Sequence, residues 1–92
     1  MSSEQYVQKK ITDYLKAKGF YTFKVIKANK SGVPDIIACQ PGSGRFVGIE
    51  VKKPSSKSNV SDLQKHNIEL INGCNGVAFV ACSVEDVRSY FD

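Results

Sequence analysis

Three ionisable residues stand inside apolar segments of this sequence, at positions where a strand ordinarily carries valine or isoleucine. Asp35 lies in Gly32–Ile37, and fifteen residues later Glu50 lies in Val47–Pro54, which also carries Lys52. Because side chains alternate between the faces of a strand, Glu50 and Lys52 share one face, and Val47, Ile49 and Val51 cover the other. Two carboxylates and an ammonium on neighbouring strands are typical of the metal site of a metal-dependent phosphodiesterase.

A second interpretation of the Glu-x-Lys sequence is a solvated ion pair of little energetic value on an exposed strand. The surrounding residues favour the metal site, because Asp35 and Glu50 are flanked by apolar side chains that indicate burial. Removing a lone charge from water is costly, so buried charges are normally paired or bind a metal.

The length of 92 residues predicts one domain, residues 1–92, with one modest core. An apolar fraction of 41% and a charged fraction of 24% are typical of a globular chain. No stretch approaches the roughly 20 apolar residues of a membrane span, so no membrane partner is expected. The N-terminal residues lack the basic-then-apolar order of a signal peptide. A net charge of +4 favours a polyanionic partner.

The three cysteines, Cys39, Cys74 and Cys82, have no C-x-x-C spacing and are odd in number. They therefore indicate neither a disulfide framework nor a zinc site. Their apolar neighbours predict ordinary buried thiols, as in a protein of the reducing cytoplasm.

Hydrophobic periodicity predicts the order helix, three strands, helix, strand and short helix. Gly19 ends the first helix, turn sequences separate the strands, and Ser61 is a candidate N-cap of the second helix. The last strand should lie parallel to a neighbour after a right-handed helical crossover, which gives a mixed four-stranded sheet flanked by helices. The expected elements are helices 3–18, 62–72 and 84–90 and strands 20–28, 33–39, 45–52 and 76–82.

With this order and these motifs, the chain resembles the PD-(D/E)xK nuclease superfamily, an α/β (α+β) fold with a restriction-endonuclease-like α-β-β-β-α-β core. More closely, it resembles the small stand-alone members of the virus-type replication-repair nuclease (VRR-Nuc) family. The resemblance extends from Glu4 to Phe79, and its core motif pairs Gly32–Asp35 with Glu50–Lys52. It implies a bacterial or phage-encoded protein.

The resemblance implies that Asp35 and Glu50 bind a divalent metal, with the main-chain carbonyl of Val51 as a third ligand. Hard oxygen ligands suit Mg²⁺ or Mn²⁺ rather than zinc. Lys52 would orient the attacking water or stabilise charge on the phosphate, a role that suits a compact ammonium on a flexible stem.

Two further residues each allow two interpretations. Glu4 is either an acid that favours the N-terminus of the first helix or a further metal ligand, since related nucleases carry an acid there. Gln64 completes a capping-box sequence that begins at Ser61, yet family members have a glutamine here that reaches the active site. We favour the catalytic role for both, although the tyrosine that follows the glutamine in some members is replaced by Ile68.

Other polar residues are assigned from their position in the predicted elements. His66 falls on the side of its helix away from Gln64, so we expect it to be exposed. Ser31 is a turn residue that could also bind phosphate. Basic residues on strands and loops near the proposed site are candidate phosphate contacts, which position DNA without reading its sequence. They are Lys24, Lys27, Lys30, Lys53 and Lys57.

The resemblance implies a metal-dependent, structure-selective DNA endonuclease that resolves four-way (Holliday) junctions in DNA repair, acting as a homodimer on branched DNA. Apolar residues of the last segment could supply the dimer interface or pack on their own sheet; they are Val84, Val87, Tyr90 and Phe91. A non-catalytic DNA-binding module on a nuclease fold is an alternative, as is a flap or restriction-type endonuclease. The intact acids and lysine argue against the former, and the absence of residues for a specificity element argues against a restriction enzyme.

Overall fold

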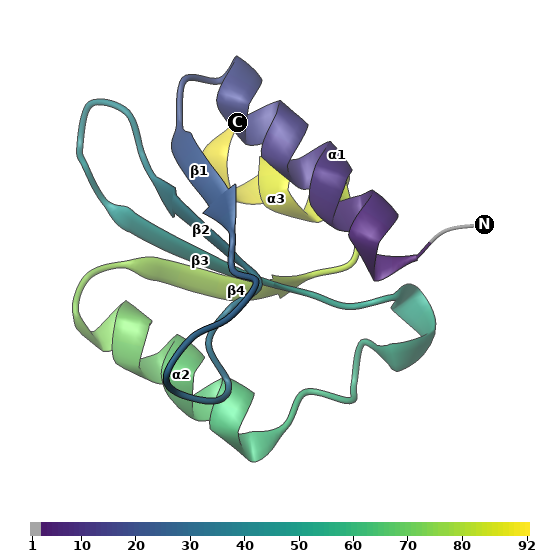
Figure 1. Ribbon diagram of the computed structural model, residues 1–92. Helices are drawn as coiled ribbons and strands as arrows, with labels where there is room; N and C mark the ends of the chain where they lie inside the picture. The colour runs from purple at the N-terminus through teal and green to yellow at the C-terminus, as the bar shows by residue number, and fades with distance from the viewer. Residues whose placement is uncertain (1–2) are drawn as a thin grey trace.

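The computed structural model describes residues 3–92, which form three α-helices and four strands (Figure 1). The predicted order α-β-β-β-α-β is followed by a third helix and interrupted by one short 3₁₀ turn, η1. The elements are α1 (Glu4–Ala17), β1 (Tyr21–Lys24), β2 (Ile36–Cys39), β3 (Phe46–Val51), η1 (Pro54–Ser56), α2 (Asp62–Gly73), β4 (Val77–Ala81) and α3 (Val84–Phe91).

The strands form one mixed sheet in the order β1-β2-β3-β4. The first three make an antiparallel meander, and β4 pairs with β3 in parallel after the crossover through α2. Helices α1 and α3 lie on one side of the sheet and α2 lies on the other (Figure 1). The fold class expected from the sequence is therefore confirmed.

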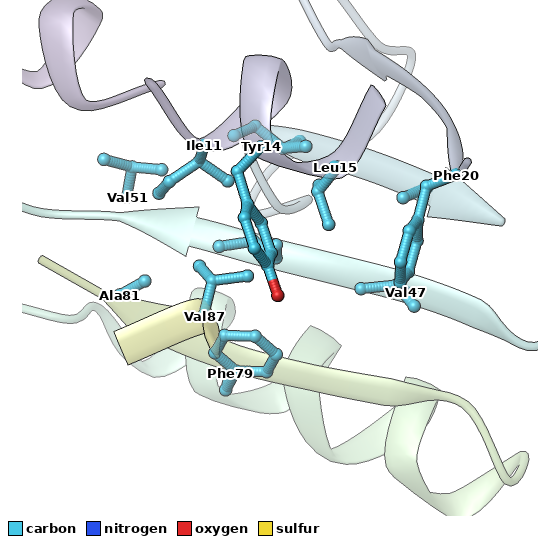
Figure 2. Close-up of a cluster of buried hydrophobic side chains, with 12 residues drawn as sticks. Ile11, Tyr14, Leu15, Phe20, Val47, Val51, Phe79, Ala81 and Val87 are labelled. Carbon is cyan, nitrogen blue, oxygen red and sulfur yellow. The ribbon is translucent and has the colours of Figure 1, made fainter. Parts of the chain in front are cut away.

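The core fills the space between the sheet and the pair α1 and α3 (Figure 2). Helix α1 contributes Ile11 and Leu15, which are four residues apart and therefore share one helix face. Strand β3 contributes alternate residues, and each fully buried aliphatic side chain stabilises the fold by about 1.5–3 kcal/mol relative to an exposed one. The large side chains with no exposed surface are Ile11, Leu15, Ile36, Val47, Ile49, Val51 and Val87.

The last helix packs on its own sheet. Val87 is fully buried, and Val84 and Phe91 pack against the core. The ring of Tyr90 stacks on Phe79 with ring centroids 3.7 Å apart, although more than half of Tyr90 stays exposed. Of the two roles considered for the apolar residues of this segment, the structure shows the packing role.

Several sequence expectations about boundaries and burial were wrong. Strand β2 begins at Ile36 instead of residue 33, because Gly32 has a φ of +80° and Pro34 has no N–H for the ladder. Strand β1 likewise covers only Tyr21–Lys24. Cys39 and Cys74 are exposed, since they lie at the hairpin end of β2 and at the C-cap of α2, whereas Cys82 is buried.

Candidate active site

Glu50 is the buried acid of the sheet face that α2 covers. It lies on β3 between Ile49 and Val51, which point into the core, so strand alternation turns Glu50 to the opposite face. Only 4% of Glu50 is exposed. Its Oε2 accepts a hydrogen bond of 3.0 Å from Nε2 of Gln64 and lies 3.8 Å from Nζ of Lys52. Its Oε1 is buried and has no hydrogen-bond partner among residues 3–92.

Asp35 lies beside Glu50 because of the register between β2 and β3. Ile36 is opposite Ile49 in this antiparallel pair. Asp35, the residue just before β2, therefore falls next to Glu50, the residue after Ile49. The Oδ2 atom of Asp35 accepts a hydrogen bond of 2.8 Å from the main-chain N–H of Val51. This bond fixes the carboxylate against the strand that carries Glu50 and Lys52.

Two glycines let the segment before Asp35 pack tightly between the sheet and α2. A Cβ on Gly32 would lie 2.8 Å from Cγ of Leu63, and the positive φ also disfavours any larger residue there. A Cβ on Gly48 would lie 2.9 Å from Cγ of Pro34 and 3.1 Å from Cδ1 of Ile71. The Gly-Val-Pro-Asp sequence is therefore held in place by α2, and that packing sets the position of the Asp35 carboxylate.

Gln64 caps α2 and also reaches the buried acid. Its Oε1 accepts from the main-chain N–H of Ser61, while Oγ of Ser61 accepts from the main-chain N–H of Gln64, which completes the capping box. Its Nε2 donates to Glu50 at the same time. One amide group thus ties the start of α2 to the buried acid of β3.

The pKa of Glu50 is raised from its ordinary value of 4.5 to about 8, and burial is the largest cause. The negative charge of Asp35 and the hydrogen bond that protonated Glu50 can make with the Asp35 side chain contribute to this rise, the Lys52 ammonium opposes it, and the charge of Glu4 adds a smaller increase. Glu4 is half-buried in the first turn of α1, near enough for its charge to act on Glu50. The site therefore carries more negative charge than one lysine balances.

The residues present fit a divalent cation. A buried carboxylate oxygen without a partner is costly, and a bound cation would compensate it. The donor set consists of carboxylate oxygens, which suit Mg²⁺ or Mn²⁺. Across residues 3–92, no three His, Cys, Asp or Glu side chains converge closely enough to hold an ion by themselves. A complete ligand set therefore needs main-chain oxygen or water besides Asp35 and Glu50.

The other candidate residues lie on the surface around this group. His66 and Ser31 are exposed, as are the five lysines proposed as phosphate contacts. Lys24 pairs with Ile36 in the sheet, so its side chain lies on the core face of the sheet, opposite to the face that carries Glu50. Lys53 and Lys57 flank η1, which connects the end of β3 to α2. Lys27, Lys30 and Ser31 belong to the loop between β1 and β2.

Asn67 is a polar residue that the sequence analysis missed. It is 5% exposed, and its Nδ2 donates to the main-chain oxygens of Leu63 and Ser31 at 2.9 and 3.3 Å. Asn67 comes three residues after Gln64, so the two lie on neighbouring turns of the same face of α2. That spacing was a signal that could have found it.

Comparison with known families matches residues 2–86 of this chain to the VRR-NUC domain. A solved structure described as a VRR-NUC domain is 26% identical, with a TM-score of 0.79 over 97% of this chain and 94% of that one. No curated protein matches. The family match and the fold are those of a nuclease-type domain. The chain belongs to the VRR-NUC family, which confirms the resemblance found in the sequence.

Between residues 3 and 92, no helix has the length and apolar composition needed to cross a bilayer.

Proposed function

We propose that this protein is a metal-dependent, structure-selective DNA endonuclease that hydrolyses phosphodiester bonds. The observation that carries the proposal is the partnerless Oε1 of Glu50, buried beside Asp35, Lys52 and Gln64. A folding role for this group is disfavoured, because an unpaired buried carboxylate destabilises a small domain.

Asp35 and Glu50 would hold Mg²⁺ or Mn²⁺ together with the main-chain carbonyl of Val51, and Glu4 is a further candidate ligand. When bound, the cation supplies positive charge to the scissile phosphate and makes water acidic enough to act as a nucleophile. Gln64 fixes one oxygen of Glu50, so the other oxygen keeps a defined direction. Preorganised ligands of this kind lose little entropy when the cation binds.

Lys52 is suited to act on the water or on the phosphate. Its side chain is 16% exposed, and its Nζ lies 3.8 Å from Glu50, within reach of both the acid and the solvent. The ammonium would orient the attacking water and stabilise the charge that develops on the phosphate oxygens.

We further propose that the substrate is branched DNA, with the four-way junction as the preferred form, and that the active unit is a homodimer. The exposed lysines Lys24, Lys27, Lys30, Lys53 and Lys57, with Ser31, would contact phosphates and position the strand. The longest dimension of the chain is 33 Å, which covers about ten base pairs of B-DNA at 3.4 Å each. One copy is therefore too small to contact all arms of a junction, and two copies related by two-fold symmetry would present paired sites.

The test uses linear, flapped, splayed and four-way DNA of matched sequence, each incubated with Mg²⁺, Mn²⁺ or a chelator. We expect cation-dependent cleavage of the four-way junction on two strands, placed symmetrically about the branch, by a protein that sediments as a dimer. Lys52→Ala should abolish cleavage, whereas Lys9→Ala serves as a matched control, because Lys9 is exposed on α1 and pairs with Asp13.

Each outcome decides between the alternatives. Full activity in excess chelator would contradict the metal site. Cleavage of linear duplex by a monomer would leave the nuclease in place and refute junction resolution. Salt-dependent binding without cleavage of any substrate would identify a non-catalytic DNA-binding module.

A further inference from the structure

A cavity of about 490 Å³ opens on the α2 side of the sheet, next to the proposed active site but separate from it. It lies between the hairpin that joins β2 to β3, the loop between β1 and β2, and the second half of α2. The lining includes Lys30, Arg45, Phe46, Asn67, Leu70 and Cys74. Its volume falls within the range of roughly 300–1,000 Å³ that is usual for ligand pockets.

The cavity and the acids lie along one face of β3. Phe46 and Glu50 are four residues apart and share this face, so their Cα atoms are about 13 Å apart at 3.3 Å per residue. Pro34 and Ile71 pack over Gly48 between them and separate the two sites. A few nucleotides of a DNA strand cover this distance, since each advances about 3.4 Å along a B-form strand.

The chemistry of the lining matches a nucleotide. Phe46 is 48% exposed, and together with Leu70 it offers an aromatic and apolar surface for the flat face of a base. Lys30 and Arg45 supply two positive charges, and the lining contains no Asp or Glu. Asn67 uses its Nδ2 for two main-chain oxygens, while its Oδ1 accepts no hydrogen bond from the described residues. That oxygen is an acceptor for an N–H group on the edge of a base.

We propose that this cavity binds an unpaired nucleobase of the DNA strand that is being cut, with the adjoining phosphates held by Lys30 and Arg45. The proposal rests on the proposed nuclease function and adds to it the substrate feature that the enzyme recognises. Bases at a branch or a bulge lack a full set of stacking partners, so moving one into a pocket costs less there than in a continuous duplex. Recognition of such a base would select branched DNA without reading its sequence.

The test measures binding without cleavage. The protein carrying Lys52→Ala is titrated, in the presence of chelator, into two fluorescein-labelled duplexes of equal length, one of which contains a single unpaired thymidine. We expect tighter binding to the duplex with the unpaired thymidine. Phe46→Ala should weaken binding to that duplex by about 5- to 100-fold, the usual effect of losing one base–aromatic stack, and should leave the paired duplex unaffected.

Two variants control for shape and for general loss of aromatic surface. Phe46→Leu keeps the apolar bulk but loses the ring, so most of the preference should still disappear. Phe23→Ala removes a ring of similar exposure, 47% against 48%, from β1, outside the cavity, and should leave the preference intact.

Arg45→Gln should weaken binding to both duplexes and lower the salt slope by about 1, as expected for a phosphate contact.

Equal binding of both duplexes by a correctly folded protein would overturn the proposal, as would an unchanged preference in Phe46→Ala. If Phe46→Ala loses the preference and sedimentation shows that it has also changed from dimer to monomer, the cavity would instead be a contact between two copies of the chain. Cleavage is measured separately on the protein with Lys52 intact. Base binding that survives without any cleavage would therefore refute the nuclease function and leave the cavity's ligand established.

Discussion

The two faces of the sheet differ in what they bury. The face under α1 and α3 buries aliphatic and aromatic side chains in a continuous core (Figure 2). The face under α2 buries Glu50 and Asn67, brings Pro34 and Ile71 onto Gly48, and leaves a cavity near the hairpin end. The first face buries a cluster of apolar side chains, whereas the second keeps a buried polar atom unpaired.

Strand β3 serves both faces through the alternation of its residues. Val47, Ile49 and Val51 stabilise the fold, while on the opposite side of the strand Phe46 faces the cavity and Glu50 faces Gln64. The residues that stabilise the fold and the residues of the proposed site are therefore immediate neighbours in β3, and they differ in the face of the sheet to which they point. Substitutions at adjacent positions should therefore have opposite consequences.

On the core face, Ile49→Ala should lower the free energy of unfolding by about 2–5 kcal/mol, because it leaves a cavity among fully buried neighbours. Urea unfolding measures the change. In the fraction that remains folded, the cleavage rate per molecule should stay close to that of the unmodified protein. A stability loss well below this range would show that the core face is not the main source of stability.

On the opposite face, Glu50→Gln should reduce cleavage by about 100-fold or more, since a charged group of the reaction is lost. Asp35→Asn should act in the same way, and DNA binding should survive in both variants. Without a cation, stability should change little below about pH 8, where Glu50 is already protonated, and should rise above it, where a buried carboxylate is replaced by a neutral amide of the same shape. A Glu50→Gln variant that unfolds as readily as Ile49→Ala would erase the contrast between the faces.

Gln64→Glu sharpens the comparison at the residue that joins α2 to the acid. Glutamate serves the capping box as well as glutamine does, so the melting temperature should change little. Its second oxygen would face Oε2 of Glu50 in place of an N–H donor, so cleavage should fall through repulsion and an altered cation site. Melting curves and cleavage rates are measured on the same preparation. Unchanged cleavage would show that Gln64 acts only as a helix cap.

The smallest expected effect concerns pH in the absence of divalent cations. Glu50 keeps its proton up to about pH 8 in the folded protein, whereas the unfolded chain loses it near 4.5. The folded state therefore binds more protons in this window, so stability should fall as pH rises from about 4.5 to 8 and level off above. Glu50→Gln should lose this component of the pH dependence. Melting temperatures in chelator measure it, and identical pH profiles for the two proteins would contradict a raised pKa.

The sequence predicted the sheet and the acids because both depend on local patterns. Alternation in Val47–Val51 gave the faces of β3, and the pair Asp35 and Glu50 followed from the family motif and its spacing. The sequence could not decide between the two contacts of Gln64. Its amide has an oxygen that can accept from Ser61 and an N–H group that can donate to Glu50, and only the packing of α2 shows that both bonds form. The cavity was also beyond reach, since Arg45 and Asn67 come together only through tertiary contacts.

The parallel pairing of β3 with β4 has a consequence for the order of folding. The meander joins strands that are close in sequence, whereas β4 must wait for the whole α2 crossover, and such non-local pairings form slowly. The main-chain N–H of Lys52 bonds to the oxygen of Ala81 on β4, and Gln64 lies within the crossover itself. We therefore expect the acids of β2 and β3 to meet first and the lysine and glutamine to be fixed last. During synthesis on the ribosome, the chain would stay inactive until β4 has been made and has joined the sheet.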